Sequence, residues 1–68
     1  MNLSKLTMPR INYLRENLNL TEDEEQVFDL LVKNKTIKEI SDRVQISPRS
    51  VARRIAMIKR KMNDMEDL

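Results

Sequence analysis

Two helix-start signals follow one another closely in the second half of the chain, between residues 36 and 62 (TIKEISDRVQISPRSVARRIAMIKRKM). Thr36 and Glu39 form a capping-box pattern, in which the hydroxyl and the carboxylate each bond a backbone amide that the first helical turn leaves unpaired. Ser47 can cap a second helix in the same way, and Pro48 suits its first position because that position needs no amide hydrogen. Two helices joined by so short a connection cannot lie antiparallel, so the sequence predicts a steep crossing of the helix-turn-helix kind.

Apolar residues recur at helical spacing in four segments, at about 8–18, 22–33, 37–44 and 48–64. Thr7 is the expected cap of the first segment, and Thr21 with Glu24 forms another capping box before the second. Neither the alternation of β-strands nor the turns of hairpins occurs in the sequence. The sequence therefore predicts an all-α fold, a small four-helix domain that contains a helix-turn-helix.

Composition limits the chemistry that this chain of 68 residues can perform. It has no Cys, His or Gly, which excludes disulfides, thiolate and imidazole metal ligands, and Gly-rich phosphate-binding loops. So short a chain also has little room for the concave walls of a ligand pocket. We expect no enzymatic activity, cofactor, metal or small-molecule ligand. Because no apolar run is long enough to span a bilayer, we also expect a cytoplasmic protein without membrane contact.

Positive charge is concentrated in the second half of the chain. Residues 1–34 contain four Lys or Arg and six Asp or Glu, a net charge of −2. Residues 35–68 contain nine and five, a net charge of +4, and no acid occurs from residue 43 to residue 63. On a helical wheel of about 100° per residue, the apolar stripe of the last helix comprises Val51, Ile55, Ile58 and Met62. The opposite side comprises Arg49, Arg53, Ala56, Met57 and Arg60.

A helix with arginines and small residues on one side fits the major groove of duplex DNA, where arginine matches the two acceptors of guanine. The sequence therefore predicts a sequence-specific regulator of transcription that binds double-stranded DNA through the helix at about 48–62. A solvent-facing cationic helix without a ligand is the alternative. The N-terminal end of such a helix points to base edges, so the expected base contacts are Arg49, Ser50 and Arg53. The expected phosphate contacts are Thr36, Lys38, Arg54, Lys59, Arg60 and Lys61.

Residues 20–62 resemble the DNA-binding domain of LuxR/GerE-type regulators and, nearly as well, region four of bacterial sigma factors. The matching residues are Leu20-Thr21, Val27, Leu30-Leu31, Lys38-Glu39-Ile40, Ile46-Ser47, Val51 and Ile55. The resemblance implies a helix-turn-helix in which DNA is touched by Lys38, Arg49, Ser50, Arg53 and Arg54. We expect a single domain, 1–68, with an N-terminal helical extension (1–19), a helix-turn-helix core (20–62) and a C-terminal tail (63–68).

The chain differs from the family that it resembles in two respects: the residues of the turn and the position of the helix that the family uses for dimerisation. Where the family usually has Ala and then Gly, this chain has Ser41 and Gln45. Serine is small enough for the helix crossing, whereas Gln45 is expected to adopt a left-handed or otherwise strained conformation at a cost of about 1 kcal/mol or more. The family's dimerisation helix follows the recognition helix, but here the additional helix precedes the core, so the family's dimer contact is not carried over.

The apolar stripe of the last helix continues beyond the expected core, with spacings of three and four residues that are typical of a coiled-coil seam. The residues of this seam are Ile58, Met62, Met65 and Leu68. They could form a homodimer, which would read two half-sites of DNA, or they could pack against the N-terminal helix of the same chain.

Two rival functions remain open at the level of the sequence. A sigma-like or adaptor module would bind RNA polymerase or another regulator through the acidic residues 22–25 or through the methionines of the seam. Helix-start chemistry explains those acids without a partner, because negative charge is favoured at a helix N-terminus. A protein that coats nucleic acid without specificity would bind any duplex equally.

Overall fold

The computed structural model describes residues 3–66, and within that range it contains helices and no strand. A short 3-10 helix, η1 (Leu3–Lys5), is followed by α1 (Met8–Asn17), α2 (Glu22–Val32), α3 (Ile37–Val44) and α4 (Pro48–Glu66). The expected all-α fold is confirmed, and each α-helix begins where the capping pattern places it. The ends differ from expectation by at most two residues, which is the usual uncertainty of helix boundaries.

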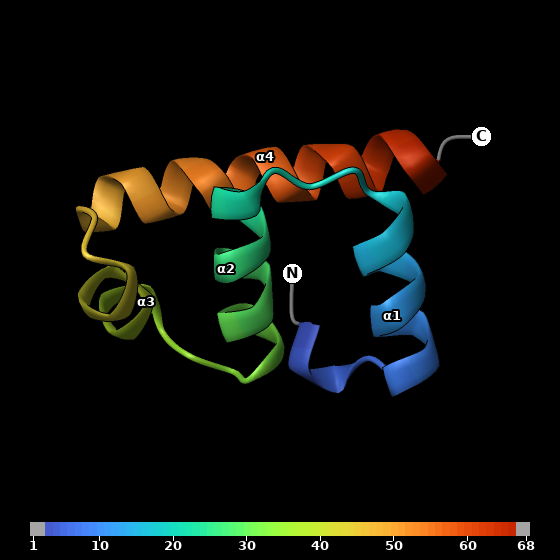
Figure 1. Ribbon diagram of the computed structural model, residues 1–68, viewed down its shortest axis with the longest axis horizontal. Coiled ribbons are helices and arrows are strands. Elements are labelled where there is room, and N and C mark those ends of the chain that lie inside the picture. The colour runs from blue at the N-terminus through green and yellow to red at the C-terminus, as the bar shows by residue number, and fades with distance from the viewer. Residues whose placement is uncertain (1–2, 67–68) are drawn as a thin grey trace.

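The other helices are arranged along α4, which has 19 residues and runs along one edge of the molecule in Figure 1. α1 and α2 both extend away from α4 toward the same side, and α3 lies near the N-terminal end of α4 (Figure 1). In this view α4 runs horizontally whereas α3 is seen almost end-on. The two helices therefore cross steeply, as their short connection requires.

Both predicted capping boxes are present. The Thr21 hydroxyl accepts from the Glu24 amide (3.2 Å), and the Glu24 carboxylate accepts from the Thr21 amide (3.0 Å). Thr36 and Glu39 repeat this arrangement at the start of α3 with the same two distances, 3.2 and 3.0 Å. Each box satisfies two amides that the first turn cannot pair, which explains why α2 and α3 begin where they do.

The turn between α3 and α4 is built without glycine. Gln45 has φ 59° and ψ 43°, so the predicted left-handed conformation is confirmed. Its amide donates to the carbonyl oxygen of Ser41 (2.9 Å), and the Ser41 hydroxyl donates to the carbonyl oxygen of Ile46 (2.5 Å). Ser41, buried at the helix crossing, therefore holds the turn with both its backbone and its side chain.

The hydrophobic core lies where the four α-helices meet. The largest fully buried side chains are Leu14 of α1, Val27 and Phe28 of α2, Ile40 of α3, and Val51 and Ile58 of α4. Burial of one side chain of this kind contributes about 1.5–3 kcal/mol. Leu3 of η1 is also buried, although the spacing of apolar residues did not predict this element. α1 is further tied to α2 because the Arg15 guanidinium donates to the Asp29 carboxylate (2.5 Å).

The methionine seam of α4 packs within the chain as far as the structure describes it. Ile58 is completely buried, so it offers no surface to a second copy. Met62 and Met65 are partly buried and pack against the core, while Leu68 lies outside the described residues. Met62 and Met65 therefore contact the core of their own chain and keep part of their surface exposed. Between residues 3 and 66, no helix is both long and apolar enough to cross a membrane.

Candidate nucleic-acid interface

α4 turns one side to the core and another to solvent. Val51 and Ile58 are completely buried, which fixes the rotation of the helix about its own axis. The residues on the other side are exposed, and we call them the basic face: Arg49, Ala52, Arg53, Ala56, Met57, Lys59 and Arg60. The helical wheel predicted that Arg49, Arg53, Ala56, Met57 and Arg60 lie opposite the stripe, and all five are exposed. Ala52 and Lys59, which the wheel places on the flanks, are exposed as well.

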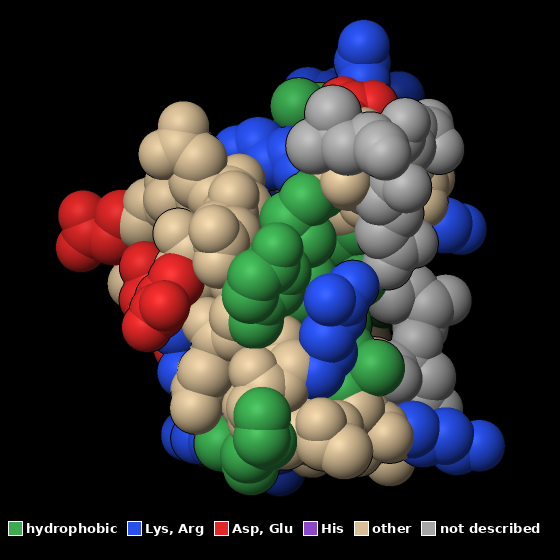
Figure 2. All heavy atoms as spheres, turned by 90° about the vertical axis from the view of Figure 1, so that its right-hand side faces the viewer, with side chains coloured by type: hydrophobic (Ala, Val, Ile, Leu, Met, Phe, Trp, Pro, Cys, Tyr) green, Lys and Arg blue, Asp and Glu red, His purple; other side chains and the backbone are tan. Residues whose placement is uncertain are grey.

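The two arginines expected to read bases are available to a ligand. Arg49 and Arg53 are exposed, and neither has a hydrogen bond or ion pair with another residue of the described range. Figure 2 views the molecule from its α1 side, the end at which α4 finishes, and it shows Lys and Arg side chains at the top of the molecule there as well. Both guanidinium groups can therefore meet an incoming acceptor without first breaking a contact.

Ser50 is half-buried at the start of α4 and takes part in its cap. Its amide donates to the Ser47 hydroxyl (3.1 Å), which confirms Ser47 as the cap. The Ser47 hydroxyl in turn donates to the Ser50 hydroxyl (3.0 Å). A hydroxyl has one hydrogen to donate besides its acceptor positions, so Ser50 retains a donor for a further partner.

The predicted contacts at the start of α3 are exposed, but an acid lies beside them. Thr36 and Lys38 are both at the surface. The Glu39 carboxylate accepts from the Thr36 amide, and this backbone hydrogen bond is the main cause that lowers the pKa of Glu39 below its usual value. The helix start therefore carries a negative charge next to Lys38 at neutral pH, and the capping box already occupies the amides of Thr36 and Glu39.

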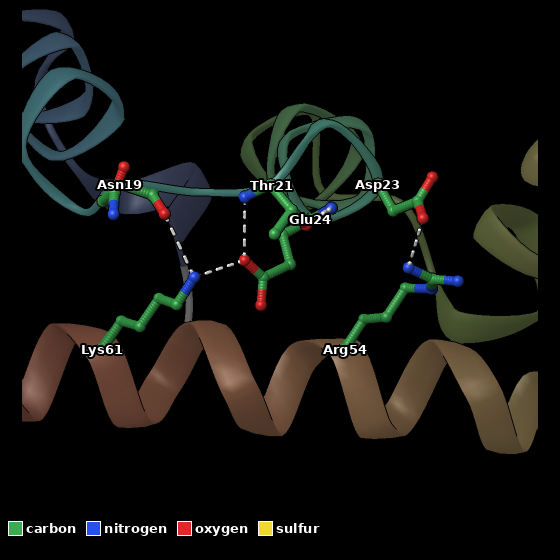
Figure 3. A network of polar contacts seen from close by, with 6 residues as sticks. All are labelled: Asn19, Thr21, Asp23, Glu24, Arg54 and Lys61. Atoms are coloured by element: carbon green, nitrogen blue, oxygen red, sulfur yellow. Dashed lines mark hydrogen bonds and ion pairs between the residues drawn. The ribbon is translucent and has the colours of Figure 1, made fainter.

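Lys61, expected to contact a phosphate, lies in a network with α2 that the sequence did not predict (Figure 3). Its ammonium donates to the Glu24 carboxylate (2.5 Å) and to the carbonyl oxygen of Asn19 (3.1 Å). The same Glu24 oxygen accepts from the Thr21 amide (3.0 Å). Glu24 is only 7% exposed, yet its pKa is lowered, because the hydrogen bonds from Lys61 and Thr21 outweigh the effect of burial.

Arg54 also has an acidic partner on α2. Its guanidinium lies 3.2 Å from the carboxylate of Asp23, whose side chain is 68% exposed (Figure 3). Arg54 and Lys61 are seven residues apart, which is about two turns, so they lie on one flank of α4, and this flank faces the first turn of α2. Their common position was readable from the sequence, but the packing that brings the acids to them was not.

The arrangement of α2, α3 and α4 defines a helix-turn-helix domain with an exposed basic helix. The chain belongs to the LuxR family of bacterial regulatory proteins, because the family model GerE, described as "Bacterial regulatory proteins, luxR family", matches residues 18–66. This family consists of DNA-binding regulators of transcription and not of enzymes, so the resemblance found in the sequence is confirmed. Comparison with curated proteins and with solved structures gave no significant match.

Proposed function

We propose that this chain is a sequence-specific regulator that binds double-stranded DNA with α4 in the major groove. The observation that carries the proposal is that Arg49 and Arg53 are exposed and unpaired in the described range, opposite a stripe of which Val51 and Ile58 are completely buried. A major groove accepts one α-helix, and an arginine that donates to both acceptors of guanine is the commonest specific contact. The domain then acts in the cytoplasm, where bacterial DNA lies.

In this proposal the first two turns of α4 read bases. Arg49 and Arg53 donate to guanine, and Ser50 donates its hydroxyl hydrogen to a base or a nearby phosphate. Ala52 and Ala56 are exposed beside these arginines, and their small side chains allow the helix backbone to approach the base edges.

The proposed phosphate contacts differ in how easily they are reached. Thr36, Lys38, Lys59 and Arg60 are exposed and can contact the two strands that border the groove. Arg54 must exchange the Asp23 carboxylate for a phosphate, which is feasible because Asp23 is mostly exposed and would be solvated again.

Lys61 is in a different position, because its departure would leave Glu24, which is only 7% exposed, with the Thr21 amide and without a cation, and this is unfavourable for a carboxylate that is largely removed from water. We therefore propose that Lys61 mainly fixes α4 against α2 and adds little to phosphate binding.

Selection of bound sequences from a random pool of duplexes tests the proposal. The full chain should enrich a defined sequence, and Arg53→Ala should lose about 1–3 kcal/mol of discrimination at one base pair. Lys59→Ala should weaken binding to all duplexes alike. Lys33→Ala removes a charge from the exposed C-cap of α2 and serves as the control, with affinity unchanged. Recovery of the pool without enrichment would contradict the proposal.

The same selection experiment also tests the oligomeric state of the protein on DNA. An enriched inverted repeat, with half-sites about one helical turn apart, would indicate a homodimer, because two-fold proteins read two-fold sites. A single half-site would indicate a monomer. The dimer surface would have to exclude Ile58, which is completely buried.

The rival function as a protein-interaction module gains no support from the acidic first turn of α2. Asp23 and Glu24 are both paired with cations of α4, so this cluster is partly used inside the chain. Binding to RNA polymerase or another regulator would have to rely on the remaining acids, Glu22 and Glu25, or on the partly exposed methionines of the seam, Met62 and Met65.

A further inference from the structure

Met57 is a large apolar side chain on the basic face, and neither the fold nor the proposed arginine contacts require it there. Met57 is 42% exposed, whereas Val51 and Ile58 of the stripe on the opposite side of α4 are completely buried. It follows Arg49 and Arg53 at intervals of four residues, so the three side chains form one row along the helix. This row spans about 12 Å, which is close to the width of the major groove, about 12 Å.

The surroundings of Met57 restrict what could cover it. It lines a shallow surface hollow together with Ser50, Arg53 and Arg54 of α4 and with Thr21 and Glu24 of α2. Arg54 is paired with Asp23, but Arg53 also lines this hollow and has no partner in the described range. An apolar protein surface would bury the Arg53 guanidinium without a partner, at a cost in solvation, so the hollow favours an anionic polymer. The occupant that fits an apolar group between arginines is therefore duplex DNA.

The major groove of DNA offers one apolar group, the C5-methyl group of thymine. A methionine side chain is flexible and polarizable, so it can adapt its path to reach such a methyl group. Ala56, which is also exposed beside it, adds no bulk that would hold the helix away from the base pair.

We infer that Met57 is a specificity-determining residue that contacts the C5-methyl group of a thymine, next to the base pair read by Arg53. This inference rests on the proposed function, because that function places α4 in the major groove. It adds a preference for an A·T pair that the arginines cannot supply, because they recognise guanine.

Single replacement of each thymine by deoxyuridine in the enriched duplex tests the inference, because deoxyuridine lacks only the methyl group. For the unmodified chain, one replacement should weaken binding about four-fold, the equivalent of one buried methyl group. Met57→Ala should bind the thymine and deoxyuridine duplexes equally at that position, and Met57→Leu should keep the difference. Met8→Ala, which truncates an exposed methionine of α1, should leave the four-fold difference unchanged.

The outcomes separate this inference from the proposed function. A duplex that is bound specifically, but in which no thymine methyl group depends on Met57, overturns the inference and leaves the proposed function in place. The same holds if Met57→Ala retains the preference for thymine over deoxyuridine. If no duplex is enriched at all, the proposed function itself has failed.

Discussion

Within the turn of the helix-turn-helix, Gln45 has the backbone conformation that is least favourable for a residue with a side chain. Its φ of 59° places a side chain in the left-handed region, where a β-carbon costs about 1–2 kcal/mol. Glycine avoids that cost but loses more conformational freedom on folding. Gln45→Gly should therefore raise the free energy of unfolding by about 0.5–1 kcal/mol, measured by urea denaturation.

A control for this prediction is Gln26→Gly, because Gln26 is exposed within α2 and glycine in a helix interior is destabilising by about 1 kcal/mol. The two variants should shift stability in opposite directions. A loss of stability in Gln45→Gly would show that the glutamine side chain has a stabilising contact that outweighs its backbone conformation.

Glu24 makes the stability of the chain depend on pH. Its pKa in the folded protein is lowered from 4.5, first by the hydrogen bond from Lys61 and then by the Thr21 amide. Around pH 4.5 the unfolded chain therefore binds more protons at this position than the folded one. The contribution of Glu24 is complete well above pH 4.5 and is lost as pH falls through its lowered folded pKa.

Urea denaturation between pH 7 and pH 3 should show this loss, and Glu24→Gln should lose less stability over the same range. Part of the pH dependence should remain in that variant, because the pKa of Glu39 is lowered in the same direction. Equal pH profiles for the two proteins would mean that Lys61 does not stabilise the ionised carboxylate.

At the scale of the elements, α4 has three distinct sides. Its apolar stripe joins the core, its flank with Arg54 and Lys61 meets the first turn of α2, and its basic face is exposed. Through this flank, acidic side chains of α2 lie close to a helix that is proposed to bind an anion. Asp23 in particular competes with phosphate for Arg54.

Asp23→Asn should therefore raise the affinity for DNA several-fold, because Arg54 would no longer exchange one partner for another. Because Arg54 contacts one phosphate in the complex of either protein, the slope of log affinity against log salt should change by less than about 0.9, the effect of one whole phosphate contact. Fluorescence anisotropy with the enriched duplex at several salt concentrations measures both quantities.

Glu22→Gln is the matched control for Asp23→Asn, since it removes one negative charge from an exposed position of the same turn. In an Arg54→Ala background, Asp23→Asn should have no larger effect than this control. If the effect persists there, Asp23 acts through the general charge of the surface and not through Arg54.

At the scale of the whole molecule, features that depend on residues close together in the sequence could be predicted, whereas contacts between residues far apart could not. Caps and apolar spacing act within a few residues, so the capping box of Thr21, the left-handed Gln45 and the exposure of Arg53 were all readable. The contact between Glu24 and Lys61 joins residues 37 positions apart. It depends on which flank of α4 meets α2, and this is decided by the packing of the core.

The burial of Leu3 illustrates the same limit. It lies in a 3-10 helix of three residues, which is too short to show a periodic pattern. Its position follows from the space that the larger helices leave beside α2. The basic face was predictable because one side of a long helix is exposed whenever the other is buried, whereas the partners on its flanks were not.

The basic face of α4 is the surface that we propose to meet DNA. Chemical-shift mapping by NMR during titration with the enriched duplex tests this claim most directly, because it reports each backbone amide of the full chain. We expect the largest changes between residues 49 and 60 and at the start of α3, with α1 little affected. Largest changes at α1 or at Glu22 and Glu25, with Arg49 and Arg53 unchanged, would contradict it.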